Sequence, residues 1–213
     1  MTKKIKNLFI KLHRKYVCYK KRRKLKYKDF SILSNNCWGG FIYQEFDLPY
    51  TSPTIGLFIY ERDYVKFLSN IKYYFSLPLE FIKVEESKYF DKVTDNGTKE
   101  ITYPIAKLND IEIFFMHYHS QEEAVEKWER RKMRVNFDRL LVKMSERTDC
   151  DLETVKSFLE LPYNNKICFT ESEYNLKNCI KIDEFAELNK KGGDETPYTL
   201  KTIDIYKILN EMK

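Results

Sequence analysis

Short apolar runs alternate with stretches of helical spacing from residue 29 to the C-terminus. The apolar runs predict strands at residues 30–33, 55–59, 79–84, 101–106, 111–116, 140–144, 167–170 and 180–182. The helical spacing predicts helices at residues 41–46, 61–75, 120–134, 151–161 and 202–212. This alternation is typical of α/β proteins with a mainly parallel sheet. We therefore expect one three-layer α/β domain over residues 29–213.

Local turn and cap signals refine this expectation. Asp95-Asn96-Gly97 predicts a turn, and Asn109-Asp110 joins two expected strands closely enough to predict antiparallel pairing. The central sheet is therefore expected to be mixed. Ser120 with Glu123 predicts a capping box, and Asp151 predicts a second helix start.

The first 28 residues differ from the rest of the chain. Ile5, Leu8, Leu12 and further apolar residues recur at helical spacing among lysines and arginines, which predicts a basic amphipathic helix. The segment contains 13 Lys or Arg and no Asp or Glu, whereas the remaining residues contain 25 basic and 32 acidic side chains. The arm alone makes the chain basic, which indicates an anionic partner for the arm.

Three roles of the arm stay open at this point. Residues 1–26 have the composition of a helix that lies on an anionic membrane surface. The same helix also suits packing against its own domain with a solvated basic face. Nucleic-acid binding is the least favoured role, because the chain lacks a known RNA- or DNA-binding motif.

Cysteine usage and hydropathy bear on location. The five cysteines form no CxxC pair, the start lacks the apolar stretch of a signal peptide, and no segment approaches about 20 consecutive apolar residues. We expect a cytoplasmic protein, peripheral at the inner face of the membrane if the arm binds there.

Polar side chains follow four of the expected strands, in residues 34–37, 117–120, 145–149 and 170–172. The carboxyl ends of parallel strands meet at one edge of a sheet, where ligands of α/β proteins bind. The sequence therefore predicts a site at that edge.

Cys37 is the candidate nucleophile. It stands between a strand and a helix that opens with Gly39 and Gly40, and free N–H groups at a helix start favour a thiolate. Those N–H groups also suit a phosphate or a developing oxyanion, and Asn35 or Asn36 would orient the substrate. The alternative is that Cys37 is a small buried residue beneath Trp38 and that the glycines allow tight packing.

His117 is the candidate base, because it shares its strand parity with Ile111, Ile113 and Phe115, whereas His119 also remains possible by position. A structural histidine is the alternative. A solvated helix face that matches the helix dipole is the default explanation for Arg131 and Arg134 on the following helix, and binding of donor phosphates is the alternative. We expect no metal, since ligands at recognisable spacing are lacking and Asp149-Cys150-Asp151 is only a weak carboxylate pair.

Several segments together resemble the bacterial family known as domain of unknown function 1919. They are SNNCWGGFIYQEFDLPYTSPTIGLFI, YPIAKLNDIEIFFMHY, KWERRKMRVNFDRLLVK and LPYNNKICFT, and the resemblance covers about residues 29–185. Cys37, His117 and Arg131 lie in these motif segments, which favours His117 over His119. The family is commonly described as exopolysaccharide-biosynthesis proteins, so the resemblance implies assembly of exopolysaccharide, capsule or lipopolysaccharide.

Three hypotheses about function follow. The first is acyl transfer to a glycan or lipid-linked glycan from a thioester donor such as coenzyme A, with Cys37 as nucleophile and His117 as base. The second is glycosyl or sugar-phosphate transfer. The third is a non-enzymatic, membrane-associated assembly factor of the same pathway.

Overall fold

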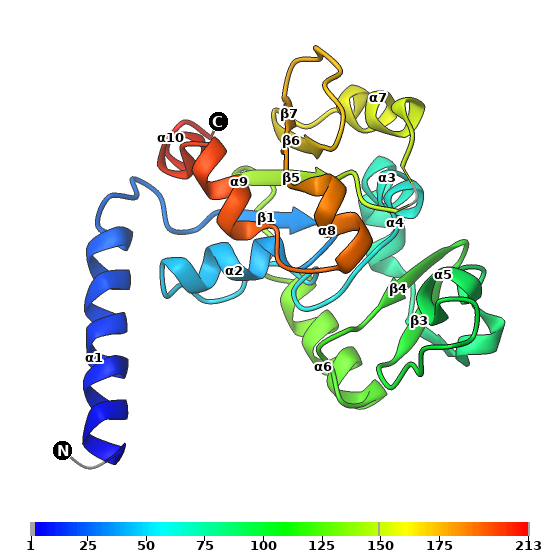
Figure 1. The fold of residues 1–213 in the computed structure, drawn as a ribbon, viewed down its shortest axis with the longest axis horizontal. Coiled ribbons are helices and arrows are strands. Elements are labelled where there is room, and N and C mark those ends of the chain that lie inside the picture. The colour runs from blue at the N-terminus through cyan, green and yellow to red at the C-terminus, as the bar shows by residue number, and fades with distance from the viewer. Residues whose placement is uncertain (1–2, 149, 213) are drawn as a thin grey trace.

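The computed structural model describes residues 3–148 and 150–212 and contains two sheets (Figure 1). The larger one is a parallel sheet in the order β1-β5-β6-β7, formed by β1 (Ser31–Ser34), β5 (Leu140–Ser145), β6 (Asn165–Thr170) and β7 (Cys179–Lys181). The smaller one is antiparallel, in the order β2-β3-β4, and consists of β2 (Glu80–Ile82), β3 (Ile105–Leu108) and β4 (Ile111–Phe114). The expected α/β class with a mainly parallel sheet is confirmed.

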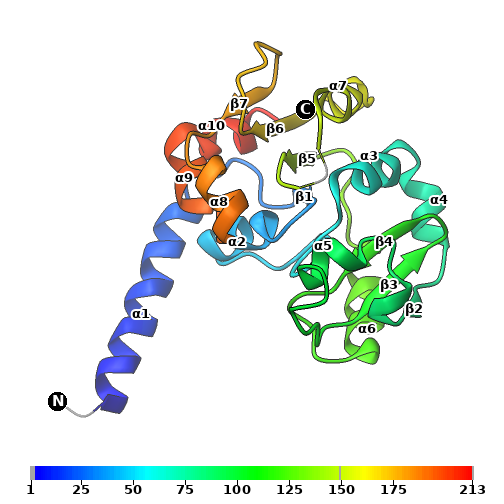
Figure 2. The ribbon, with the colours of Figure 1, turned by 45° about the vertical axis from the view of Figure 1, so that its right-hand side comes forward.

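Most of the helices lie around these sheets, and the first one projects away from them (Figures 1 and 2). They are α1 (Lys3–Arg22), α2 (Trp38–Glu45), α3 (Glu61–Ser69), α4 (Ile71–Ser76), α5 (Phe90–Thr94), α6 (Gln121–Lys132), α7 (Leu152–Glu160), α8 (Phe185–Lys191), α9 (Thr196–Thr202) and α10 (Ile205–Asn210). Ser120 and Asp151 cap α6 and α7 as predicted, through the N–H groups of Glu123 and Thr154. The Glu123 carboxylate, however, accepts from the N–H of His119, one residue before the cap.

Each face of the parallel sheet is buried under a different layer. Along β5, Leu140, Val142 and Met144 join an apolar cluster with α3, α7 and the smaller sheet. Leu141 on the opposite face joins a cluster with α2, α8 and α10. Strands that are covered on both faces are expected to be apolar throughout, so the buried Lys143 in β5 is an exception that needs a partner.

The antiparallel pair predicted around Asn109-Asp110 is confirmed, but it belongs to the separate small sheet and not to the central one. Residues 55–59, predicted as a strand, form no regular strand. This segment makes one antiparallel bridge, between Phe58 and Phe114, and Ile59 donates to the carbonyl of Asn35. The prediction was wrong because the segment crosses between the sheets, with Gly56 at a φ of +72°.

Two predicted helices are divided. The helix predicted at 61–75 breaks at Asn70 into α3 and α4, and the closing helix at 202–212 is preceded by α9 and interrupted near Ile203. Helix α8 has no counterpart among the predicted elements. Asp95, Asn96 and Gly97 adopt positive φ, which confirms the predicted turn.

Helix α1 extends away from the body of the molecule (Figures 1 and 2). Only its C-terminal part is anchored: Lys21 pairs with Glu45, and Arg22 donates to the carbonyl oxygen of Asp47 at 2.7 Å. Leu25, just after the helix, is buried in the same cluster as α2. The predicted basic helical arm is therefore present, with its first turns projecting.

The β1–β5 pairing is completed by a side chain. Asn35, which is fully buried, accepts from the Ser145 N–H at 2.9 Å and donates to the Ser145 carbonyl at 3.1 Å. A side-chain amide thereby extends the backbone ladder by one residue beyond β1 and locks the two strand ends together.

We predict that Asn35→Ala lowers the free energy of unfolding by about 2–4 kcal/mol, because both backbone groups of Ser145 lose a buried partner. Urea denaturation followed by circular dichroism measures the change. Asn7→Ala, at an exposed position of α1, is the matched control and is expected to stay within about 0.5 kcal/mol of the unmodified protein. A loss for Asn35→Ala no larger than that of the control would contradict this role.

Candidate functional site

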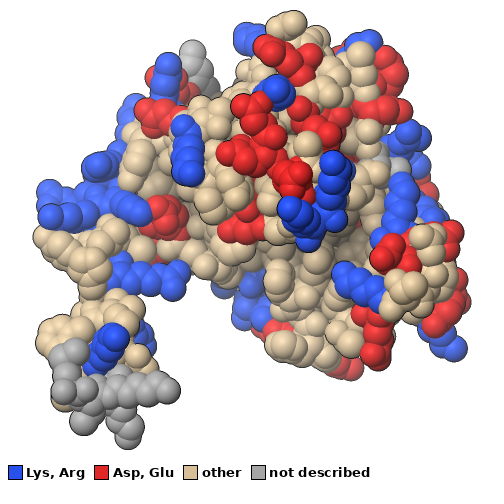
Figure 3. Space-filling model, viewed as in Figure 1, with Lys and Arg blue, Asp and Glu red and all other residues tan. Residues whose placement is uncertain are grey.

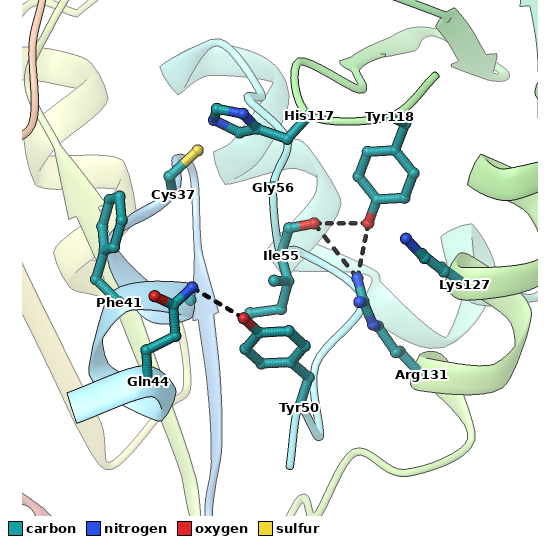
Figure 4. A pocket seen from close by; sticks show the side chains of 11 residues that line it. Cys37, Phe41, Gln44, Tyr50, Ile55, Gly56, His117, Tyr118, Lys127 and Arg131 are labelled. Carbon is teal, nitrogen blue, oxygen red and sulfur yellow. Dashed lines mark hydrogen bonds between the residues drawn. The ribbon is translucent and has the colours of Figure 1, made fainter. Parts of the chain in front are cut away.

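A cavity of about 270 Å³ lies between α2, the segment around Gly56 and helix α6 (Figure 4). Its polar lining consists of Cys37, Gln44, Tyr50, His117, Tyr118, Lys127 and Arg131. Four of the predicted site residues, Cys37, Gly40, His117 and Arg131, are thus brought to one cavity. They come from positions separated by up to 94 residues in sequence.

The turn between β1 and α2 positions Cys37. The Asn36 side chain accepts from the N–H of Trp38 at 3.1 Å, and the Ser34 hydroxyl accepts from the N–H of Gly39 at 3.1 Å. A Cβ on Gly39 would lie 3.0 Å from the Ser34 hydroxyl oxygen, so glycine allows this close turn. Strand β1 is therefore followed by a tight turn into α2, and Cys37 lies in this turn.

The backbone donors expected to hold an oxyanion are already used. Gly39 donates to Ser34, and Gly40 donates to the Cys37 carbonyl at 3.0 Å. A Cβ on Gly40 would also lie 3.3 Å from a methyl group of Ile55. These contacts match the alternative in which the glycines serve close packing, and they speak against the oxyanion role.

The thiol of Cys37 is not a preformed thiolate. Burial raises the pKa of Cys37 to about 11, the carboxylates of Asp194 and Glu195 add to this effect, and Lys143 opposes it. The Sγ atom has a long contact of 4.0 Å with the carbonyl oxygen of Leu57. The activation expected from the helix start is therefore outweighed by burial.

His117 lies across the cavity from α2. Its backbone N–H donates to the Gly56 carbonyl at 3.0 Å, which fixes the chain just beyond β4. His117 is exposed, and in Figure 4 the sulfur of Cys37 points toward the His117 imidazole. Across the described residues 3–148 and 150–212, however, no hydrogen bond joins the two side chains.

Arg131 forms the opposite wall. It is buried, donates to the Tyr118 hydroxyl at 2.8 Å, and places its guanidinium 5.0 Å from the ring centre of Tyr50. The Tyr118 hydroxyl in turn donates to the Ile55 carbonyl at 2.6 Å. Lys127, one turn earlier on α6, pairs with Glu123 and lies 5.4 Å from the Tyr118 ring centre.

The remaining predicted residues lie elsewhere. Arg134 is exposed beyond the end of α6 and does not line the cavity. The Asn35 side chain is hydrogen-bonded to the backbone of Ser145, and the Asn36 side-chain oxygen accepts from the Lys143 ammonium at 3.0 Å. His119 lines a separate surface hollow near β2 and β3. The predicted substrate contacts of Asn35 and Arg134 thus find no place in this cavity.

Sequence patterns did not indicate several residues of the site. Gln44 and Tyr50 complete the cavity wall, and Gln44 donates to the Tyr50 hydroxyl at 3.0 Å. Tyr118 lies in the polar stretch 117–120 that was predicted at the site, but no role was predicted for it. The buried pair of Lys143 and Glu195 lies close enough to shift the pKa of Cys37. A lysine inside an apolar run was the one available signal for this pair, because such a residue requires a buried partner.

Within the part of the chain that the structure describes, no three or more His, Cys, Asp or Glu side chains are grouped so as to hold a metal ion. None of the helices described has both the length and the apolar character needed to cross a membrane.

Comparison with known proteins places the chain in a family. A protein of Haemophilus influenzae described only as uncharacterized is 34% identical over 190 residues, which cover 89% of this chain and 85% of that protein. The family description "Domain of unknown function (DUF1919)" matches residues 7–210, which extends the resemblance of residues 29–185 into α1 and the C-terminal helices. The chain belongs to the DUF1919 family.

Proposed function

We propose that the protein acts in the assembly of a bacterial surface polysaccharide and that its cavity binds an anionic sugar derivative during acyl transfer. The pathway rests on the description commonly given to the family that the sequence resembles. The chemistry rests on one observation, the convergence of Cys37, His117, Lys127 and Arg131 on a single cavity.

The cavity wall suits a sugar that carries a negative charge. Lys127 and Arg131 supply two cations, and a guanidinium has five N–H donors, so the contacts of Arg131 Nη1 leave capacity for a ligand anion. Tyr50 and Gln44 offer an aromatic face and polar groups for sugar hydroxyls. The volume of about 270 Å³ accommodates one such group and not a long oligosaccharide.

A thiol of high pKa acts by general-base catalysis. His117 would remove the Cys37 proton as the sulfur attacks the acyl carbonyl of a thioester donor such as coenzyme A, and would return it to the departing donor thiolate. A sugar hydroxyl, deprotonated by His117, would then attack the Cys37 thioester. The acyl group passes to the sugar, and the proton returns to the Cys37 sulfur.

We predict that Cys37→Ala and His117→Ala each reduce acylation of the surface polysaccharide by about 100-fold or more, because each removes a group that takes part in the transfer. The measurement is NMR of polysaccharide purified from a deletion strain that expresses each variant. Cys150→Ala and His119→Ala are the controls, since neither residue lines the cavity. A fully acylated polymer from both Cys37→Ala and His117→Ala would refute acyl transfer, and a polymer of altered sugar composition would favour glycosyl or sugar-phosphate transfer.

Alkylation of the Cys37 thiol should depend strongly on pH. Because the pKa of Cys37 is about 11, its rate of reaction with iodoacetamide should rise about tenfold per pH unit between about pH 7 and pH 10. Cys179 is the internal reference, since a hydrogen bond with Cys168 lowers its pKa to about 7 and its rate should level off above about pH 8. Peptide mass spectrometry assigns each rate. A rate for Cys37 that levels off below about pH 8 would show a preformed thiolate instead.

The projecting arm supports a peripheral attachment to an anionic membrane. Apolar side chains of α1 that are roughly half exposed include Leu8 at 56% and Phe9 at 62%. The helix carries Lys and Arg but no acidic residue, and Figure 3 shows only basic and uncharged side chains on its described part. An exposed apolar stripe beside basic residues matches an interfacial helix, and such attachment would hold the cavity near a lipid-linked glycan.

We predict that Leu8→Glu and Phe9→Glu each weaken binding of the full chain to vesicles with about 30% phosphatidylserine by roughly tenfold, because each removes buried apolar area and adds a repelled charge. Vesicle co-sedimentation gives the affinity. Met133→Glu alters an 80% exposed apolar residue of the body and serves as the control. Equal binding of all three variants and the unmodified protein would exclude α1 as the contact.

A further inference from the structure

A buried cluster of charges lies at the carboxyl edge of the parallel sheet, on the face covered by α2 and α8. Lys143 is fully buried, and Glu195, which is 3% exposed, lies just before α9. Lys143 pairs with Glu195 and also donates to the Asn36 side chain at 3.0 Å. The cavity lined by His117 and Arg131 does not include Lys143 or Glu195.

Three donors from one short stretch hold the Glu195 carboxylate. One oxygen accepts from Lys143 and from the Ser145 hydroxyl, the latter at 2.7 Å, and the other accepts from Arg147 at 3.2 Å. Lys143 and Ser145 share a face of β5 because side chains alternate along a strand, and Arg147 follows with the same spacing. The chain therefore binds this carboxylate with the set of donors that proteins use for a ligand anion.

The segment that carries Glu195 is joined to α8 by two glycines at positive φ, Gly192 at 72° and Gly193 at 132°. Figure 1 draws α8 in front of the ends of β1 and β5, and Arg147, just after β5, donates to the Leu188 carbonyl of α8 at 3.2 Å. Among the described residues, four buried side-chain atoms have no hydrogen-bond partner: Thr196 Oγ1 belongs to this segment, Asn189 Oδ1 to α8, and the other two to Tyr64 in α3 and Trp128 in α6. The two glycines at positive φ mark the point about which the segment can turn.

We propose that Lys143, Ser145 and Arg147 form a binding site for a phosphoryl group and that Glu195 occupies this site in the closed form. A parallel sheet presents its ligand site beyond the carboxyl ends of its strands, where this cluster lies. A phosphoryl dianion matches the two cations better than the single charge of Glu195 does. The ligand enters as residues 192–196 move away about Gly192 and Gly193.

Two other carboxylates adjoin the cluster. Glu61 accepts from the backbone N–H of Arg147 at 3.0 Å, and Asp194 accepts from the backbone N–H of Thr196 at 2.8 Å. Both are engaged with backbone donors and neither accepts from the Lys143 ammonium among the described contacts. Among the described carboxylates, Glu195 is the one on which the side-chain donors of Lys143, Ser145 and Arg147 converge. Its displacement would free one donor of each side chain for the incoming group, while Lys143 keeps its contact with Asn36 and Arg147 its contact with the Leu188 carbonyl.

The experiment compares binding of inorganic phosphate to full-length variants by isothermal titration calorimetry. Glu195→Gln keeps the shape of the segment but removes the competing charge, so it should bind phosphate about tenfold more tightly than the unmodified protein. Glu187→Gln on α8 is the matched control, because Glu187 is exposed and pairs only with Lys191 among the described ion pairs. Adding Lys143→Met to Glu195→Gln should abolish the gain.

An affinity of Glu195→Gln equal to that of the control would overturn the proposal, and so would a gain that persists without Lys143. If Glu195→Gln does not fold, hydrogen exchange of the unmodified protein decides the question. Phosphate should then increase exchange in residues 190–196, whereas unchanged exchange at saturating phosphate would refute displacement. These outcomes are independent of the acyl-transfer proposal, since neither Cys37 nor His117 is altered.

Discussion

The pairing of β1 with β5 is the constraint on which the rest of the molecule depends. It joins residues 31–34 to residues 140–143, and Asn35 extends it to Ser145 through a separation of 110 residues. The turn that carries Cys37 begins where this pairing ends. Parallel strands require a long crossover, and here the crossover contains α3, α4, the small sheet and α6. Because the same crossover brings His117 and Arg131 to the cavity, strand pairing determines the composition of the site.

Burial of the sheet on both faces accounts for the ionic cluster. Lys143 occupies a position where the neighbouring strands and α2 exclude water, and burial lowers its pKa while Glu195 opposes that shift. Burial by itself would raise the pKa of Glu195, but the charge and hydrogen bond of Lys143 outweigh it, so the pKa of Glu195 is lowered. A buried ion pair seldom contributes much net stability, although loss of one partner is costly. The C-terminal segment is therefore held to β5 by a contact whose partners are specific, and it is this contact that the proposed phosphoryl group would replace.

Sequence periodicity correctly predicted those elements whose signal lies in their own residues. Strands β1, β5 and β6 and helices α6 and α7 are apolar runs or capped amphipathic stretches, and their positions agree with the prediction to within a few residues. Residues 55–59 have the composition of a strand, but among them only Phe58 pairs with a strand residue, Phe114. Whether such a segment pairs depends on the position of distant segments in the fold, which periodicity does not give. Cys37 and His117 were predictable because they follow apolar runs. Gln44, Tyr50 and Glu195 were not, since their positions depend on contacts between distant segments.

The expectation of an activated thiol failed for a reason that links the two sites. A helix start offers partial positive charge only where its N–H groups are free, and Ser34 and the Cys37 carbonyl occupy those of Gly39 and Gly40. What remains is the field of the nearby charges, in which Asp194 and Glu195 raise the pKa of Cys37 and Lys143 lowers it. In the proposed displacement, movement of residues 192–196 would carry both carboxylates away and place the charge of the bound anion beside Lys143 in the position of Glu195. The protonation of Cys37 would then depend on the balance of Lys143 and that anion, so an anion bound at β5 would act on the thiol without touching it.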